Sequence, residues 1–418
     1  MSEQANYGCA VGFGTRLIGR ADDMVVPIGM HDFTEAARRC VLVDKTMFIA
    51  DVLDCDASVV GCCRPEGFGK SMNLSMLKAF LERPAAGRAD RSLFAGSRIW
   101  DADGGHYRGE YACYPVVSLD FSGAAGSGAA VVGVVRDALS SECVRLLPFL
   151  EAPDLPRDKV RHIERVARGA ANEDEVDSVL AVLIELLEMA FDEQVVLLVD
   201  GYDAAWLSRA GIRGTRDDGS AELLDRVLFD AIVGAGDSMR LACLMGERPG
   251  PAEAALALRG CSYCSATPLS TWCDRWFGLS DAEVEALLTH AGREEHLDDA
   301  REWLEGYRFG GEYCSSPARV IGFLDRGCTP PVRADLYGYA DCLSRVVGDW
   351  NLDRLSVLFD LLEAHGCVEV LLCLGAAGSD EVHADDIWMA LYLSGFLTTD
   401  MTEEPESDAR LRALRLPN

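Results

Sequence analysis

The sequence predicts an α/β fold, in which a parallel sheet is flanked by helices and followed by a mostly helical region. Two patterns favour this fold. Between residues 24 and 270, short aliphatic runs alternate with longer segments whose apolar residues recur at helical spacing. Beyond residue 271, helical patterns dominate. The chain has 418 residues, of which 49% are hydrophobic, and this is enough for substantial cores.

The first elements are two expected helices. One should follow Asp32, because Glu35 stands three residues later and completes a capping box. The other should follow Asp44 and Lys45. These two charged residues are either a helix cap and a solvated charge, or side chains that line the site formed by the next segment.

That next segment begins with the apolar run Ser58–Cys63, which is typical of a strand buried on both faces. The loop Arg64–Gly69 follows, and Lys70 and Ser71 then open a segment with helical spacing. Strand, glycine-containing loop, Lys-Ser and helix together are the arrangement that holds nucleotide phosphates. Lys70 supplies a positive charge, and the Ser71 hydroxyl can ligate Mg²⁺. The segment therefore predicts a phosphate-binding loop (P-loop).

The loop departs from the motif G-x-x-x-x-G-K-[ST] at one position. Arg64 stands where the motif has its first glycine, which permits a tight turn. Gly67 is the residue that can take over part of that role. The alternative is an ordinary strand-to-helix turn with a solvent-facing lysine, but the flanking strand and helix favour the P-loop.

Two further aliphatic runs are expected as buried strands. Tyr114–Phe121 is one. The other lies within Val195–Trp206, where aliphatic residues end in Asp200, as in a central strand that delivers a carboxylate for Mg²⁺ beside the loop serine. Phosphate-loop enzymes commonly place a water-orienting glutamate next, but here the residue is Gly201. Asp203 is the nearest carboxylate that can substitute, and a plain Asp-Gly turn is the alternative.

Arg240–Met245 is expected as a fourth strand, and Ser265–Leu269 as a short fifth one. Glu247 and Arg248 follow the fourth strand closely. One of them is a candidate to sense the γ-phosphate, and a solvated turn is an equally good interpretation.

The C-terminal part is expected to be helical. Ser280 and Glu283 form a second capping box, and helical patterns cover residues 298–306, 315–325, 339–365 and 383–397. Between them, Trp303–Gly310 is an aromatic-rich stretch. Its Arg308 either reaches a phosphate or packs on Trp303 as a surface charge.

These patterns predict a loosely ordered N-terminus over residues 1–23 and an α/β P-loop domain over 24–270. A helical lid domain over 271–400 and a tail over 401–418 follow.

Composition restricts the classes of partner. With 39 basic and 68 acidic residues the formal charge is −29, which argues against direct nucleic-acid binding. The sixteen cysteines form no disulfide framework, and the C-x-x-C at Cys261–Cys264 lacks the second pair of a zinc site. No secretory leader and no run of about eighteen apolar residues is visible, so a cytoplasmic protein without a membrane span is expected.

Several blocks, in this order, resemble the bacterial AAA-ATPase-like family, whose members often carry a C-terminal PD-(D/E)XK nuclease-like domain. The blocks are PIGMHDF (27–33), VDKTMFI (43–49), RPEGFGKSMNLSMLKAF (64–80), PVVSLDFS (115–122), LLVDGYDAAW (197–206), FGLSDAEVEALL (277–288), WLEGYRFG (303–310) and LYLSGFLTTD (391–400).

The chain departs from the family pattern in three ways. The family loop resembles R-P-R-R-F-G-K-[ST], so Arg64 is familial, whereas Glu66 and Gly67 replace two basic residues. The family strand ends in D-E-Y-D, so Gly201 lacks the acidic side chain. The final RLPN resembles the entry into the nuclease-like domain, and no nuclease activity is carried over.

The resemblance implies a P-loop NTPase sheet that binds ATP and Mg²⁺, with a helical lid. The residues expected around the nucleotide are Arg64, Gly67, Phe68, Gly69, Lys70, Ser71 and Asp200, and Ser71 and Asp200 would hold the metal. One hypothesis is a weak or partner-stimulated ATPase, with Asp203, Glu247 and Arg248 as catalytic candidates. The alternative is a degenerate nucleotide-binding or scaffold protein without hydrolysis. A protein partner or a homo-oligomer is left open.

Overall fold

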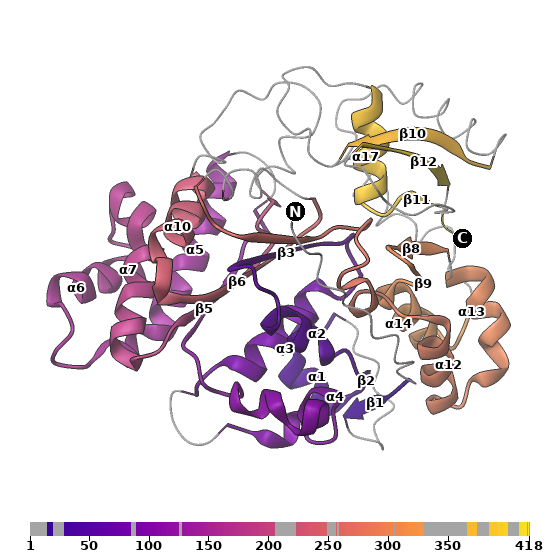
Figure 1. The fold of residues 1–418 in the computed structure, drawn as a ribbon, viewed down its shortest axis with the longest axis horizontal. Helices are drawn as coiled ribbons and strands as arrows, with labels where there is room; N and C mark the ends of the chain where they lie inside the picture. Colours follow the sequence, from indigo (N-terminus) through magenta and orange to yellow (C-terminus); the bar gives the residue numbers. More distant parts are fainter. Residues whose placement is uncertain are drawn as a thin grey trace, which may run out of the picture.

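Five parallel strands form the central sheet in the described part of this computed structural model, and helices cover both faces (Figure 1). The structure describes residues 15–19, 29–84, 89–124, 128–204, 223–248, 256, 259–304, 306–329, 366–373, 384–399, 409–415 and 417. The sheet strands are β3 (Val59–Cys63), β4 (Val116–Asp120), β5 (Val195–Asp200), β6 (Met239–Gly246) and β7 (Tyr263–Ala266). The predicted P-loop NTPase-like α/β fold is confirmed.

The sheet follows from its apolar runs, since β3 and most residues of β4, β5 and β6 are buried on both faces, whereas β7 is mostly half-buried. Val60 of β3 and Leu198 of β5 belong to one core, together with the helices on one face of the sheet. Val59 and Leu197, one residue earlier in each strand, belong to the opposite core with the helices on the other face. The alternation makes a three-layered unit.

The helices of the two layers flank the sheet on opposite sides in Figure 1. One layer consists of α1 (Phe33–Arg39), α2 (Met47–Leu53), α3 (Lys70–Leu81) and α4 (Arg98–Asp101). The other consists of α5 (Gly128–Leu146), α6 (Arg157–Ala167), α7 (Glu173–Phe191) and α10 (Asp230–Ala235). A small antiparallel pair, β1 (Leu17–Gly19) with β2 (Val41–Val43), lies beside α1.

Topology places the carboxyl ends of β3, β5 and β6 side by side. The spatial order is β4-β5-β6-β3-β7, so after β3 the chain crosses to the outermost strand β4 and returns through β5 and β6. The carboxyl ends of all five strands share one edge because the pairs are parallel. Ligands of open α/β sheets bind at that edge, where the strand order reverses.

The C-terminal region contains α12 (Asp281–His290), α13 (Leu297–Leu304), the hairpin β8 (Tyr307–Phe309) and β9 (Glu312–Cys314), and α14 (Pro317–Asp325). A further antiparallel sheet has the order β10 (Val368–Cys373), β12 (Ala409–Arg415), β11 (Thr398–Thr399), and α17 (Ala384–Leu393) packs against it. Figure 1 shows this sheet beside the β8–β9 hairpin.

Several expected elements shift or change type. The capping box expected at Ser280 and Glu283 is present. At the first helix, Asp32 is the N-cap as expected, and its side chain accepts from Glu35 N. The fifth strand starts two residues earlier than expected, at Tyr263, and the Trp303–Gly310 stretch contains strand β8 instead of an open loop. The helix expected over 339–365 lies outside the described residues.

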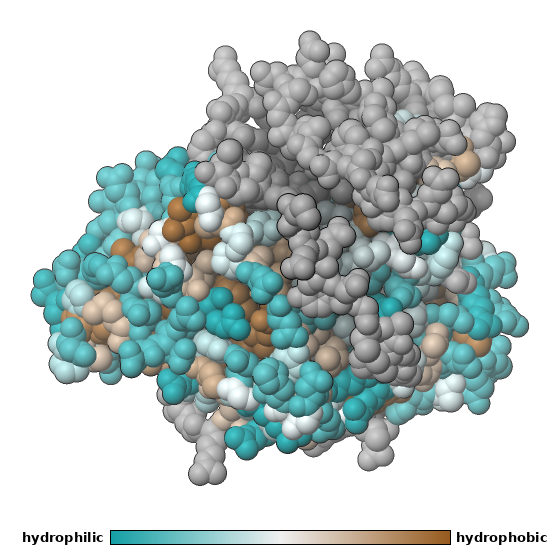
Figure 2. All heavy atoms as spheres, in the orientation of Figure 1, coloured by the Kyte–Doolittle hydropathy of each residue, from teal (hydrophilic) through white to brown (hydrophobic). Residues whose placement is uncertain are grey.

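Hydrophilic residues cover most of the face that Figure 2 presents, with apolar residues visible in smaller areas. None of the described helices combines the length and the apolar composition that crossing a bilayer requires.

Candidate functional site

The loop between β3 and α3 turns at two glycines. Gly67 has φ +82° and Gly69 has φ +85°, a left-handed region that side chains with a Cβ rarely adopt. Gly69 is also the N-cap of α3, so its conformation turns the chain into the helix. The loop therefore brings the N-terminus of α3 to the carboxyl edge of the sheet, where its unpaired N–H groups favour an anion.

Lys70 lies across this loop. Its Nζ donates to the carbonyl oxygens of Arg64 at 2.7 Å and Pro65 at 2.9 Å. The ammonium group of Lys70 therefore lies at the start of the loop, inside the turn where we expect a phosphate.

Ser71 and Asp200 meet between α3 and β5. Burial raises the pKa of Asp200, while the nearby Ser71 hydroxyl and the charge of Lys70 oppose that rise. The pairing joins a hydroxyl and a carboxylate at the C-terminal edge, and both are oxygen ligands that suit Mg²⁺.

Gly201 has no space for a side chain. Its φ is +66°, and an added Cβ would lie 2.5 Å from both Ser122 N and Ser122 Cα. The backbone after β4 is held there because Phe121 N donates to Asp200 O at 2.8 Å. The acidic residue expected at this position is therefore excluded by the packing of β4 against β5, in addition to being absent from the sequence.

Asp203 is buried and holds the turn after β6. Its Oδ2 accepts from the backbone N–H groups of Glu247 at 2.9 Å and Arg248 at 2.8 Å. Burial raises the pKa of Asp203 to about 6, although these two hydrogen bonds and the charge of Lys70 lower it. The three catalytic candidates from the sequence thus lie together, with Asp203 positioning the backbone of the other two.

Arg64 points into the interior. It is fully buried, and its Nη1 donates to the carbonyl oxygens of Cys63 at 2.8 Å and Ala266 at 2.7 Å. Its guanidinium carbon lies 5.1 Å from the Phe277 ring centroid and 5.2 Å from that of Phe309. The side chain connects the start of the loop to β7 and to the C-terminal region, while its backbone carbonyl accepts from Lys70.

The C-terminal region covers the loop at two more points. Gly67 O accepts from Ser316 Oγ at 3.1 Å and from Ala318 N at 3.2 Å, at the start of α14. The Phe68 ring packs edge-to-face on Tyr307 and Phe309 of the β8–β9 hairpin. The Phe68 side chain is buried in this cluster. Its backbone, rather than its ring, is therefore the part that we expect near a nucleotide.

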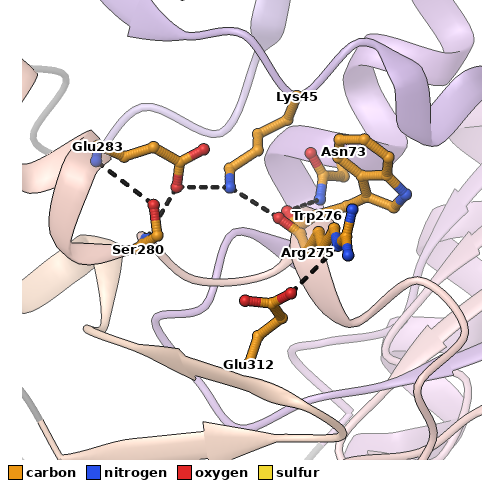
Figure 3. A network of polar contacts seen from close by, with 7 residues as sticks. All are labelled: Lys45, Asn73, Arg275, Trp276, Ser280, Glu283 and Glu312. Atoms are coloured by element: carbon orange, nitrogen blue, oxygen red, sulfur yellow. Dashed lines mark hydrogen bonds and ion pairs between the residues drawn. The ribbon is translucent and has the colours of Figure 1, made fainter. Parts of the chain in front are cut away.

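A polar network joins α3 to the C-terminal region (Figure 3). Lys45 Nζ donates to Arg275 O at 2.7 Å and to Glu283 Oε2 at 2.8 Å, and Asn73 Nδ2 of α3 donates to Trp276 O at 2.9 Å. The preceding Asp44 is buried and accepts from Thr46 N at 3.0 Å and from Arg98 N at 2.8 Å. The N-cap of α2 is Thr46, so Asp44 is not the cap that the sequence suggested.

Arg308 lies on Tyr313, with its guanidinium carbon 4.9 Å from the ring centroid. Its backbone N–H donates to Thr398 Oγ1 at 2.9 Å, which ties β8 to β11. Tyr313 is therefore one partner of the Arg308 side chain, and the predicted contact with a phosphate stays a prediction.

Asp120 is a residue that the sequence analysis left out of the site. It ends β4, and its Cα pairs with that of Asp200 in the sheet register. The available signal was that two of the buried runs, ending in SLD and LVD, both finish in aspartate.

Two comparisons with known proteins bear on the chain. A family model described as "Predicted AAA-ATPase" matches residues 27–247, which include β3, the loop, β5 and the turn after β6. A comparison with curated proteins finds no match.

Proposed function

The chain belongs to the predicted AAA-ATPase family, and on this basis we propose that it binds ATP with Mg²⁺ at the β3–α3 loop and hydrolyses it slowly. The observation that carries the proposal is that Lys70 and Ser71 open α3 directly after the turn at Gly67 and Gly69, with the Asp200 carboxylate at the end of β5 near enough for both side chains to lower its pKa. These three side chains meet at the carboxyl edge of the sheet, where the topology directs a ligand.

The donor set fits a magnesium nucleotide. Ser71 and Asp200 offer oxygen ligands, and bound Mg²⁺ would neutralise charge on the phosphates. The N–H groups at the start of α3 would receive the phosphate oxygens, and Lys70 would exchange its bonds to Arg64 O and Pro65 O for the β- and γ-phosphates.

Slow turnover follows from the packing at Gly201. Positioning and charge neutralisation supply most of the catalysis in phosphoryl transfer, and these remain available. A carboxylate directly after Asp200 is sterically excluded, so orientation of the attacking water depends on another residue. Stimulation by a partner protein is compatible with this arrangement. Binding without hydrolysis is the second candidate, and the same steric exclusion favours it.

The test compares Mg²⁺-ATP binding and phosphate release in the unmodified chain, in Lys70→Ala and in Lys78→Ala. Lys78 lies on the same helix, two turns further on, and is the matched control. We expect Lys70→Ala to weaken binding about tenfold or more, equivalent to about 1.4 kcal/mol, and to abolish turnover. Lys78→Ala should leave both unchanged.

Removing the metal gives an independent arm. Chelation with EDTA should weaken ATP binding by the unmodified chain and have little further effect on Ser71→Ala, which lacks the hydroxyl ligand. ATP binding that is the same in the unmodified chain and Lys70→Ala would overturn the proposal. Binding with no turnover would leave the second candidate.

A further inference from the structure

We propose that Asp120, at the end of β4, is the carboxylate that orients the attacking water in the proposed ATPase reaction. The inference rests on the proposed function and adds a catalytic residue to it. Asp120 would supply, from the neighbouring strand β4, the water-orienting carboxylate that the packing excludes at position 201 after β5.

The sheet register places Asp120 beside Asp200. The two strands are parallel and their Cα partners run from Val116–Val196 to Asp120–Asp200. Partner residues in neighbouring strands face the same side of a sheet, and side chains alternate along each strand. Val116, Val196 and Leu198 belong to the core on the α3 side, so Asp120 and Asp200 face α3 as well.

The same face carries the proposed phosphate-binding groups. Ser71 and Lys70 of α3 lie close enough to Asp200 to lower its pKa. Asp120 is close enough for its negative charge to raise the pKa of Asp200. One carboxylate thus lies near the serine and the lysine, and a second lies one strand away at the same edge.

The Asp120 side chain is exposed, and its orientation is fixed locally. Its Oδ1 accepts from Ser122 N at 2.9 Å and from Ser122 Oγ at 2.6 Å. Both bonds engage Oδ1. Ser122 is also the residue whose backbone fills the space beside Gly201, so the feature that excludes a side chain at 201 also sets the direction of Asp120.

The other carboxylates near the site are less suitable. Asp203 is buried and uses Oδ2 to accept from Glu247 N and Arg248 N. Glu247 follows β6, and its backbone is fixed by that same bond. Asp120 combines exposure, a locally fixed carboxylate and the register position beside the magnesium ligand.

The step that Asp120 serves is an in-line displacement at the γ-phosphorus of ATP. A water oxygen forms a bond to phosphorus, and the bond to the β–γ bridging oxygen breaks, with its electron pair remaining on ADP. Asp120 accepts a hydrogen bond from the water and takes its proton, which then leaves with inorganic phosphate or to solvent.

The experiment compares Asp120→Asn with Asp192→Asn in the full chain. Asp192 lies just before β5, at the opposite edge of the sheet, and its φ of +52° is one that asparagine tolerates. We expect Asp120→Asn to keep ATP affinity within about twofold and to lower kcat by about 10²-fold or more. Asp192→Asn should change neither. Asp120→Glu should recover part of the lost kcat, which a merely structural role of Asp120 would not predict.

Each outcome has one meaning. Suppose that kcat is unchanged in Asp120→Asn while ATP binding is still lost in Lys70→Ala. That result would overturn the role of Asp120 and leave the proposed function intact. If kcat falls in Glu247→Gln instead, the role belongs to Glu247. Binding without turnover in the unmodified chain would also overturn it. Absence of binding that depends on Lys70 would overturn the proposed function itself.

Discussion

The buried carboxyl of Asp203 makes the stability of the protein depend on pH. Burial raises its pKa from 3.8 to about 6 in the folded chain. Folding therefore favours the protonated form, and the stabilisation is fully present below about pH 4 and is lost as the pH rises through about 6. A difference of about two pH units corresponds to about 3 kcal/mol.

We expect Asp203→Asn to remove this dependence, because an amide oxygen can still accept from Glu247 N and Arg248 N. The free energy of unfolding of Asp203→Asn, relative to the unmodified chain, should rise by about 2 kcal/mol between about pH 4.5 and about pH 7.5. Urea unfolding at the two pH values measures it. The exposed Asp237 supplies the control variant Asp237→Asn. A relative stability that does not change with pH would contradict the burial argument.

Single residues also show which parts of the site could be predicted from the sequence. Lys70, Ser71 and Asp200 follow from motifs whose spacing is local, and the structure brings all three together. The destination of the Arg64 side chain was not predictable in this way. It depends on Ala266, Phe277 and Phe309, which lie far along the chain and reach Arg64 only after the C-terminal region packs on the sheet.

At the scale of elements, the contact between β4 and β5 determines what position 201 can hold. Gly169 is a matched control for Gly201, because both have φ +66° but a Cβ at Gly169 would meet nothing within 4 Å. Gly169→Ala should cost only the left-handed backbone, about 1–2 kcal/mol. Gly201→Ala should cost at least about 2 kcal/mol more, since its Cβ would meet the backbone of Ser122.

Thermal or urea unfolding of the two variants provides the comparison. Equal destabilisation would mean that the end of β4 yields to a side chain, and an acidic residue at 201 would then be sterically permitted. If Gly201→Ala is destabilised more than Gly169→Ala, as expected, then Gly201→Glu is a poor way to restore water activation.

The elements that were predictable are those with a strong local pattern. The four longer strands are continuous apolar runs buried on both faces, and α7 begins at a capping box between Asn172 and Glu175. The short strand β7 was displaced because its bounds are set by pairing with β3, where Tyr263 partners Val59. The β8–β9 hairpin was missed because its three-residue strands depend on each other and on the Phe68 cluster.

At the scale of the whole molecule, the central sheet with its helices and the C-terminal region are joined through partly buried and exposed polar contacts. The side chains of Lys45 and Glu283 are each 13% exposed, and Glu283 Oε2 accepts from both Lys45 Nζ and Ser280 N. Arg275 and Glu312, drawn in the same network (Figure 3), form an ion pair at 3.2 Å whose side chains are 49% and 44% exposed. Two ion pairs in one region thus differ mainly in solvation.

This difference predicts unequal coupling in double-mutant cycles. Lys45→Met with Glu283→Gln should give a coupling energy of about 1–3 kcal/mol in unfolding, because each charge left alone is poorly solvated. Arg275→Gln with Glu312→Gln should give about 0–1 kcal/mol, since water solvates either partner. Glutamine at position 283 can still accept from Ser280 N, so the cap of α12 is preserved in the first cycle. Equal coupling in the two cycles would mean that the C-terminal region is held through other contacts, such as Phe68 on Tyr307 and Arg64 on Phe309, and that the Lys45 bridge contributes no more than a surface pair does.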